Sequence, residues 1–194
     1  MDNNEIRNYI KKISNNFDSV YNAFYLWKNL QNSNYNIIYN EYKYFWGIVV
    51  IGLQQYWLLG IPKLFEEPRK GSWEVISIPF LLKLIPEGKD KVEIKKEIDL
   101  QKPILNNFKK WRNKILAHQD KSFVDDAKEF YKEYPIKGEQ VETLLSSIAK
   151  IIGMIESTTV NTSIIYAYYQ FRDESKQNLE DIIEILMKEN IKNN

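Results

Sequence analysis

The stretch Phe-Lys-Lys-Trp-Arg-Asn-Lys-Ile-Leu-Ala-His-Gln-Asp, residues 108–120, predicts the end of a long helix. Apolar residues recur at three- and four-residue steps in this stretch and before it, which is typical of an amphipathic helix. The apolar positions are Ile94, Ile98, Leu105, Phe108, Trp111 and Ile115. We therefore expect a helix over residues 90–117, with Pro103 as a point where it can bend.

The same periodicity predicts most of the remaining chain to be helical. Helices are expected over residues 5–31, 35–60, 73–84, 139–169 and 179–191, with a short one around 123–131. Gly60-Ile61-Pro62 should end or kink the second helix. Ser72 should cap the third, and Pro79 should kink or shorten it. No segment alternates with period two, so the prediction is an all-α helical bundle with an up-down core of four to five helices. We expect one domain over residues 1–194, with a core at about 5–170 and an additional C-terminal helix within about 176–191.

The second predicted helix is apolar nearly all round in its second half, which favours a central buried helix. Its segment 45–62 is also the one candidate for a membrane span. However, Gln54-Gln55 lies at its centre, and 18 residues is the bottom of the spanning range. The first residues lack the basic and apolar regions of a signal peptide. We therefore expect a cytoplasmic protein without a membrane partner.

The amino-acid composition excludes several kinds of functional site. The chain has no cysteine and one histidine, which excludes disulfides and a cysteine nucleophile and argues against a zinc site. No metal and no cofactor are expected. The formal charge is +1, so any contact with nucleic acid has to be local.

The single histidine, His118, makes residues 108–120 the one obvious place for proton transfer, because only imidazole has an unperturbed pKa near neutrality. Four cationic residues precede it within ten positions: Lys109, Lys110, Arg112 and Lys114. The alternatives are structural. The partial positive charge of His118 can interact favourably with the dipole at the C-terminal end of the helix. Arg112 can form a surface ion pair with Asp120 or Glu97, and the lysines can form a solvated face of the helix.

Arg112 and His118 would lie about 120° apart on an ideal helix, so they do not share one face. Either the helix unwinds before His118, or the two residues meet partners from another chain.

The string 112–118, Arg-Asn-Lys-Ile-Leu-Ala-His, resembles the Arg-x(4–6)-His signature of HEPN domains. With Trp111 before it and Gln119-Asp120 after it, the string is similar to HEPN proteins of bacterial abortive-infection systems, the AbiU type. The segments 44–46, 58–65, 75–78 and 81–82 also resemble that subgroup in order and spacing. The resemblance runs from about the mid-twenties to about residue 122.

The resemblance implies a homodimer in which both motifs line one cleft, and a metal-independent endoribonuclease that leaves 2′,3′-cyclic phosphate ends. His118 from each copy would act as base and acid, and Arg112 would hold the phosphate. Asn113 would orient phosphate or ribose. Asp120 would set the His118 tautomer or pair with Arg112. The lysines at 109, 110 and 114 would support RNA binding.

The activity implied is toxin-like growth arrest in antiviral defence by abortive infection, with RNA as substrate and a neutralising antitoxin protein as a further partner. The alternative is a catalytically inactive HEPN-like module that dimerises and binds a protein or a nucleotide.

Overall fold

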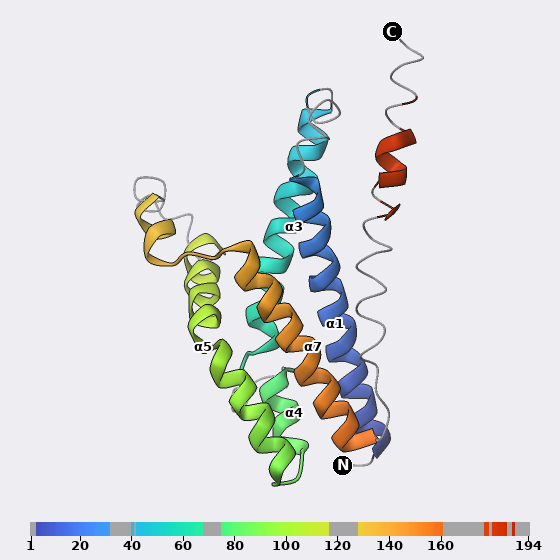
Figure 1. Ribbon diagram of the computed structural model, residues 1–194, viewed down its shortest axis with the longest axis vertical. Helices are drawn as coiled ribbons and strands as arrows, with labels where there is room; N and C mark the ends of the chain where they lie inside the picture. The colour runs from blue at the N-terminus through green and yellow to red at the C-terminus, as the bar shows by residue number, and fades with distance from the viewer. Residues whose placement is uncertain are drawn as a thin grey trace. The chain divides into compact units, whose positions relative to one another are not determined.

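The computed structural model describes residues 3–31, 40, 42–67, 75–116, 128–160, 177–178, 180–185 and 188. Its labelled helices are α1 (Asn3–Leu30), α3 (Lys43–Leu64), α4 (Ile78–Leu84), α5 (Lys89–Leu116) and α7 (Gly138–Val160). No strand occurs within the described ranges (Figure 1), so the predicted all-α class is confirmed. Residues 128–133 and 180–185 are also helical. Residues 123–127 and 161–169, parts of two predicted helices, lie outside the described residues.

Helix α4 begins later than the sequence predicts. Residues 75–77 are not helical, and the N-cap is Ser77, whose Oγ accepts a hydrogen bond from the backbone N–H of Phe80 at 3.3 Å. Ser72 as the cap is therefore wrong. Pro79 falls in the first turn, where a missing N–H leaves no helical hydrogen bond unmade, so it starts the helix instead of kinking it.

Helix α3 continues through Gly60 and Pro62 to Leu64, so the predicted end at residue 60 is also wrong. Pro62 lies in the last turn, where its missing N–H costs a single helical hydrogen bond. The helix then closes in tighter bonds, from the N–H of Phe65 to the carbonyl of Pro62 and from that of Glu66 to Lys63, each 3.2 Å.

The chain forms two compact units, and each is described by itself. The first comprises residues 1–17 and 58–165, and the second comprises residues 18–57 and 166–194. Helices α1 and α3 therefore contribute residues to both units.

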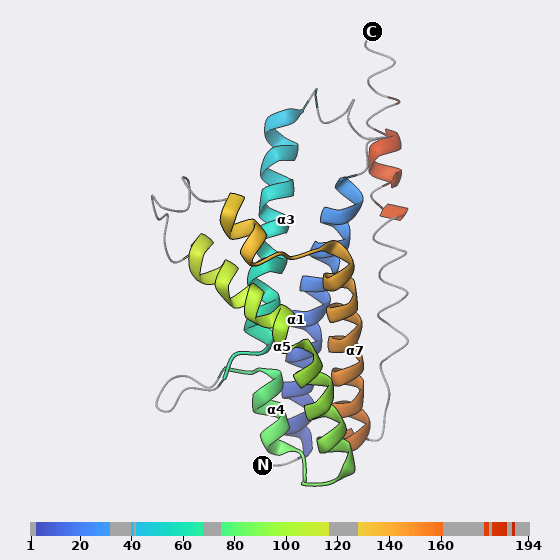
Figure 2. The same cartoon turned by 60° about the vertical axis from the view of Figure 1, so that its left-hand side comes forward.

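In the first unit, α5 and α7 lie side by side (Figures 1 and 2) and bury the apolar stripes that the sequence predicted. From α5 these are Ile94, Leu105, Phe108 and Trp111; from α7 they are Val141, Leu144, Leu145, Ile148, Ile151, Ile152 and Ile155. Ile98, also predicted for this stripe, is half-buried, and the side chain of Ile115 lies outside the described ones. Ile78, Phe80 and Leu81 of α4 are buried as well, and the Phe80 ring meets Tyr9 edge-on at 5.3 Å. This core holds the C-terminal turns of α5 in place.

In the second unit, one side of α3 packs against the end of α1. Leu30, Trp46 and Ile183 form a buried cluster flanked by Leu26, Val49, Val50 and Leu53. The centre of the Trp57 ring lies 5.4 Å from that of the Phe24 ring and 5.3 Å from that of the Trp27 ring.

The other side of α3 is exposed, so the prediction of a central buried helix is wrong. Tyr44 and Ile48 are among its most exposed side chains. By length and composition alone, α3 is apolar enough to cross a membrane, and 22% of its most apolar window is buried. A helix that is apolar on every side does not reveal from sequence which sides have partners.

Candidate functional site

Trp111 fixes the part of α5 that carries the candidate site. Its side chain is buried, and its Nε1 donates a hydrogen bond to the carbonyl oxygen of Tyr134 at 2.7 Å. One turn earlier, Asn107 Nδ2 donates to the carbonyl oxygen of Pro135 at 2.9 Å. The Trp111 ring also packs against the rings of Phe130 and Tyr131, with ring centres 5.5 Å and 4.6 Å away. Residues 130–135 are thus tied to α5 immediately beside Arg112.

The Arg112 guanidinium is partly shielded but loosely held. Its side chain is 31% exposed, and its Nη1 lies 3.9 Å from Glu66 Oε1, at the outer limit of an ion pair. Its Nε donates a long hydrogen bond of 3.4 Å to Asn113 Oδ1. A pair of this length and exposure contributes less than about 1 kcal/mol. The guanidinium has five N–H donors in a fork that matches phosphate, so an anion can displace the Glu66 carboxylate.

The sequence did not point to Glu66. It lies 46 residues before Arg112 in a charged segment after α3, and no spacing relates the two. The predicted alternative, an ion pair between Arg112 and Glu97, is wrong. Glu97 instead accepts hydrogen bonds from Lys150 Nζ at 2.6 Å and Ser147 Oγ at 2.8 Å, across α5 and α7. These bonds, that of Lys150 first, hold the pKa of Glu97 below its usual value.

The cationic residues of the motif do not form a single face of α5. On a regular helix Lys109 lies about 60° from Arg112, whereas Lys110 and Lys114 lie about 160° from it. Lys110 Nζ sits 5.8 Å from the centre of the Tyr134 ring, on the side of the aromatic contacts. Arg112, Asn113 and Lys109 therefore share one side, and the other two lysines point elsewhere.

His118 and Asp120 lie outside the described residues, and α5 is described to Leu116. The relation of His118 to Arg112 therefore stays a prediction, and so do both roles considered for Asp120. In the described part of the chain, no three His, Asp or Glu side chains gather in a way that could hold a metal ion.

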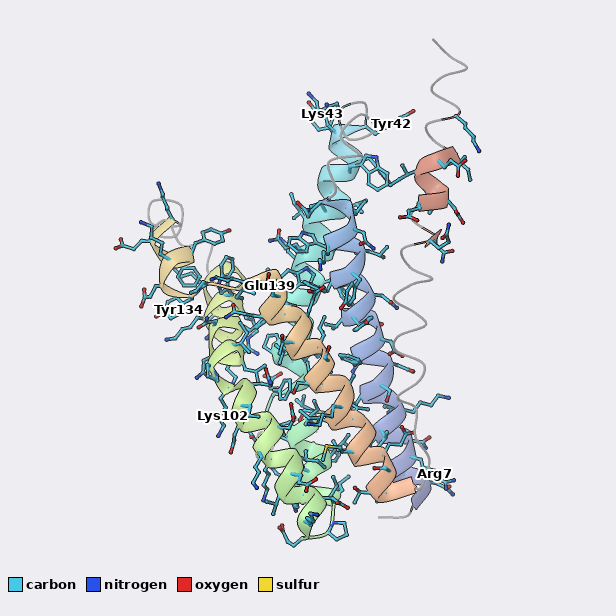
Figure 3. All side chains as sticks on the ribbon, in the orientation of Figure 1. Arg7, Tyr42, Lys43, Lys102, Tyr134 and Glu139 are labelled. Carbon is cyan, nitrogen blue, oxygen red and sulfur yellow. The ribbon has the colours of Figure 1, made fainter. Side chains whose placement is uncertain are left out.

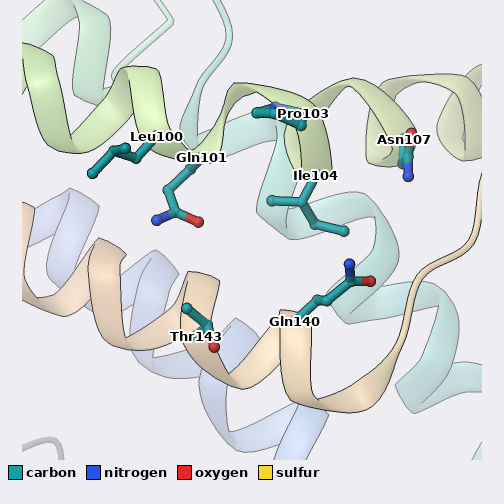
Figure 4. Close-up of a pocket in the computed structure, with 7 residues that line it drawn as sticks. All are labelled: Leu100, Gln101, Pro103, Ile104, Asn107, Gln140 and Thr143. Carbon is teal, nitrogen blue, oxygen red and sulfur yellow. The ribbon is translucent and has the colours of Figure 1, made fainter.

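A separate pocket of about 340 Å³ opens between α5 and α7 (Figure 4). It is lined by Leu100, Gln101, Pro103, Ile104, Asn107, Gln140 and Thr143. Asn107 lies about 140° around α5 from Arg112, so this pocket is not part of the Arg112 site.

An all-helical bundle with Arg112 and Asn113 near the end of a long amphipathic helix is the architecture expected of a HEPN-type domain. The sequence model of the AbiU2 family of HEPN domains matches residues 4–182, and the chain belongs to this family. Searches of curated proteins and of solved structures gave no match. The match extends the resemblance beyond the motif to nearly the whole chain, and it makes this a HEPN-type domain associated with abortive infection.

Proposed function

We propose that this protein is a metal-independent endoribonuclease whose composite site forms where two copies pair about a two-fold axis. The observation that carries the proposal is the state of Arg112. It is a partly exposed guanidinium beside the buried Trp111, and within the described ranges its contacts are long: 3.9 Å to Glu66 and 3.4 Å to Asn113. Binding a phosphate would therefore cost Arg112 only a contact that contributes less than about 1 kcal/mol.

The chemistry follows from the residue types. The His118 imidazole of one copy takes the proton from the ribose 2′-hydroxyl, and the 2′-oxygen attacks the adjacent phosphorus. The bond from phosphorus to the 5′-oxygen breaks, and His118 of the other copy gives that oxygen a proton. The products are a 2′,3′-cyclic phosphate and a 5′-hydroxyl.

The remaining motif residues hold the substrate. Arg112 binds two phosphate oxygens and stabilises the charge that develops on them. Asn113 and Lys109, on the same side of α5, orient the phosphate and the strand. Asp120 sets the His118 tautomer or pairs with Arg112. Lys110 and Lys114 add longer-range attraction for RNA, which depends on salt.

In the cell we propose that this cleavage acts in the cytoplasm, arrests growth after phage infection, and is restrained by an antitoxin protein. The reaction needs neither a metal nor a membrane.

The test is cleavage of an end-labelled RNA by the purified protein in EDTA. Arg112→Ala should lower the rate by about 10²-fold or more, and His118→Ala by about 10²- to 10⁴-fold. Lys96→Ala, which removes an exposed cation elsewhere on α5, should leave the rate unchanged. An RNA with a single 2′-deoxynucleotide should resist cleavage at that position, because it lacks the nucleophile.

Two results would contradict the proposal. One is cleavage that requires a divalent metal, and the other is full activity in the Arg112 or His118 variant. If the wild-type protein cleaves no RNA across varied sequences yet binds nucleotides or a protein, it is the catalytically inactive module.

A further inference from the structure

Helix α3 carries an unusual concentration of exposed apolar side chains. Among the described residues, eleven large apolar side chains are exposed, and six of them lie between Tyr42 and Tyr56. The five on α3 itself are Tyr44 (80% exposed), Phe45 (60%), Ile48 (74%), Ile51 (55%) and Tyr56 (53%). Tyr42 and Lys43 mark where this helix begins (Figure 3). We call these five side chains the α3 face.

Tyr44, Ile48 and Ile51 of the α3 face lie away from the side of α3 that packs within its own unit, and Phe45 and Tyr56 lie at the edge of the face. Trp46, Val50 and Leu53 point to the cluster around Leu30, and on a regular helix they lie about 100–160° from Ile48 and Ile51. The helix is therefore apolar on two opposite sides, of which one is buried. Exposed apolar patches larger than a few hundred Å² mark interaction sites.

The spacing on the exposed side is that of a helix-packing seam. Tyr44, Ile48, Ile51 and Gln55 follow one another at steps of four, three and four residues, as at the core positions of a coiled coil. Gly52 lies beside this line, and a Cβ added to it would meet nothing within 4 Å. A glycine with open space above it lets the backbone of a second helix approach closely.

We propose that the α3 face is covered by the α3 face of a second copy, with the two helices antiparallel about a two-fold axis between Ile48 and Ile51. This register places Ile48 against Ile51 of the other copy. It also places Tyr44 against Gln55 of the other copy, so the phenol hydroxyl can donate to the amide oxygen. A self-complementary surface of this kind is what an isologous dimer requires.

Charge and area favour this occupant. Lys43 and Lys63 are the only charged residues of α3, and in the proposed register Lys43 lies near Tyr56 of the other copy, so no like charges meet. The five side chains expose roughly 500 Å² on one copy. A two-fold pair would then remove about 1,000 Å² from water before the rim is counted, which is the lower limit for a specific interface.

The inference deepens the proposed function and rests on it for the two-fold symmetry of the pair, since it names the surface through which two copies meet. Its test measures mass, not cleavage, so the two can fail separately. In light scattering after gel filtration, the full chain should be a dimer and Ile48→Glu a monomer with unchanged helix content. Leu100→Glu replaces an apolar residue of α5 that is 71% exposed, and this control should stay a dimer.

Cysteine cross-linking tests the register, because the chain has no cysteine of its own. Tyr44→Cys combined with Gln55→Cys should give a covalent dimer under mild oxidation, since a disulfide needs Cβ atoms about 4 Å apart. Tyr44→Cys alone should not, because its symmetry mate lies about 16 Å away along the helix.

Four results would overturn the inference: a monomeric wild type, a dimeric Ile48→Glu, cross-linking of the single Tyr44→Cys variant, or partition of the protein into phospholipid vesicles through α3. A dimeric Ile48→Glu variant that still cleaves RNA would refute this surface and leave the proposed function standing. If the dimer behaves as expected but never cleaves RNA, the α3 face stands as the dimer interface and the proposed function is refuted.

Discussion

Trp111 and Tyr134, 23 residues apart, are joined by a 2.7 Å hydrogen bond from the indole Nε1 to the backbone carbonyl oxygen. The bond attaches the segment before α7 to α5 at the residue next to Arg112. If the hydrogen bond is removed, the partly buried carbonyl oxygen of Tyr134 is left without this donor. The resulting loss of stability is larger than the net contribution of an average hydrogen bond.

Trp111→Phe keeps an aromatic ring and removes this bond. We expect the free energy of unfolding to fall by about 1–2 kcal/mol, measured by urea denaturation. RNA cleavage should also slow, because the turn that carries Arg112 is less firmly held. The control is Trp27→Phe, a substitution in the other compact unit, which should leave the cleavage rate unchanged. If both variants lose the same fraction of the cleavage rate, Trp111 does not position Arg112.

Glu66 competes with phosphate for Arg112 if the site works as proposed. Glu66→Gln should lower KM for RNA by up to about fivefold and leave kcat unchanged, since a partly exposed pair at 3.9 Å is worth at most about 1 kcal/mol. Stability should change by less than about 0.5 kcal/mol. The neighbouring exposed Glu67→Gln is the matched control and should have no effect on KM. A rise in KM for Glu66→Gln would instead mean that Glu66 helps to position Arg112.

Asp18 on α1 should make the fold less stable as the pH rises. Burial raises the pKa of this carboxyl from 3.8 to about 6, and its Oδ1 is buried without a hydrogen bond from the described residues. The folded protein holds this proton more tightly than the unfolded chain does, so stability falls between about pH 4 and pH 6.

Asp18→Asn should therefore be more stable than the wild type at pH 7.5, by about 1 kcal/mol once solvent screening of a half-buried group is allowed for. At pH 4 the two should be equal. Urea denaturation at both pH values measures this, with the exposed Asp99→Asn as control. Equal stability of Asp18→Asn and wild type at pH 7.5 would contradict the assignment.

Glu97 should make the fold less stable as the pH falls, which is the opposite of the pH dependence expected for Asp18. Its pKa is lowered by hydrogen bonds from Lys150 and Ser147, so its contribution is present above its ordinary pKa of 4.5 and is lost as the pH falls below that value. Glu97→Gln should cost about 1–2 kcal/mol at pH 7 and progressively less in acid. Lys150→Met tests the same bridge from α7, and the double variant should lose little more than either single one. Additive losses would show that the two side chains do not act together.

The sequence predicted the packed sides of α5 and α7 correctly because each buries one side only, and a single apolar stripe at helical spacing identifies that side. The same reasoning failed for α3, where both sides are apolar and only the arrangement of neighbouring helices decides which is covered. The start of α4 was missed because a proline inside a helical pattern predicts a kinked or shortened helix. Pro79 instead lies in the first turn, two residues after the cap Ser77.

For the site, a short motif predicted roles for Arg112 and Asn113, and these roles stay predictions. The helix that carries the two residues was predicted to within a residue of its described end. Glu66 could not have been found, because a contact between residues 46 positions apart depends on how α3 ends relative to α5. The roles of His118 and Asp120 stay predictions.

The chain passes between its two compact units three times, after residues 17, 57 and 165. No uninterrupted fragment contains the whole of one unit without also containing part of the other. A cut anywhere within residues 18–165 would consequently divide both units, and loss of function in a separately expressed half would not locate the responsible residues. Genetic dissection of this protein has to rely on point substitutions in the intact chain.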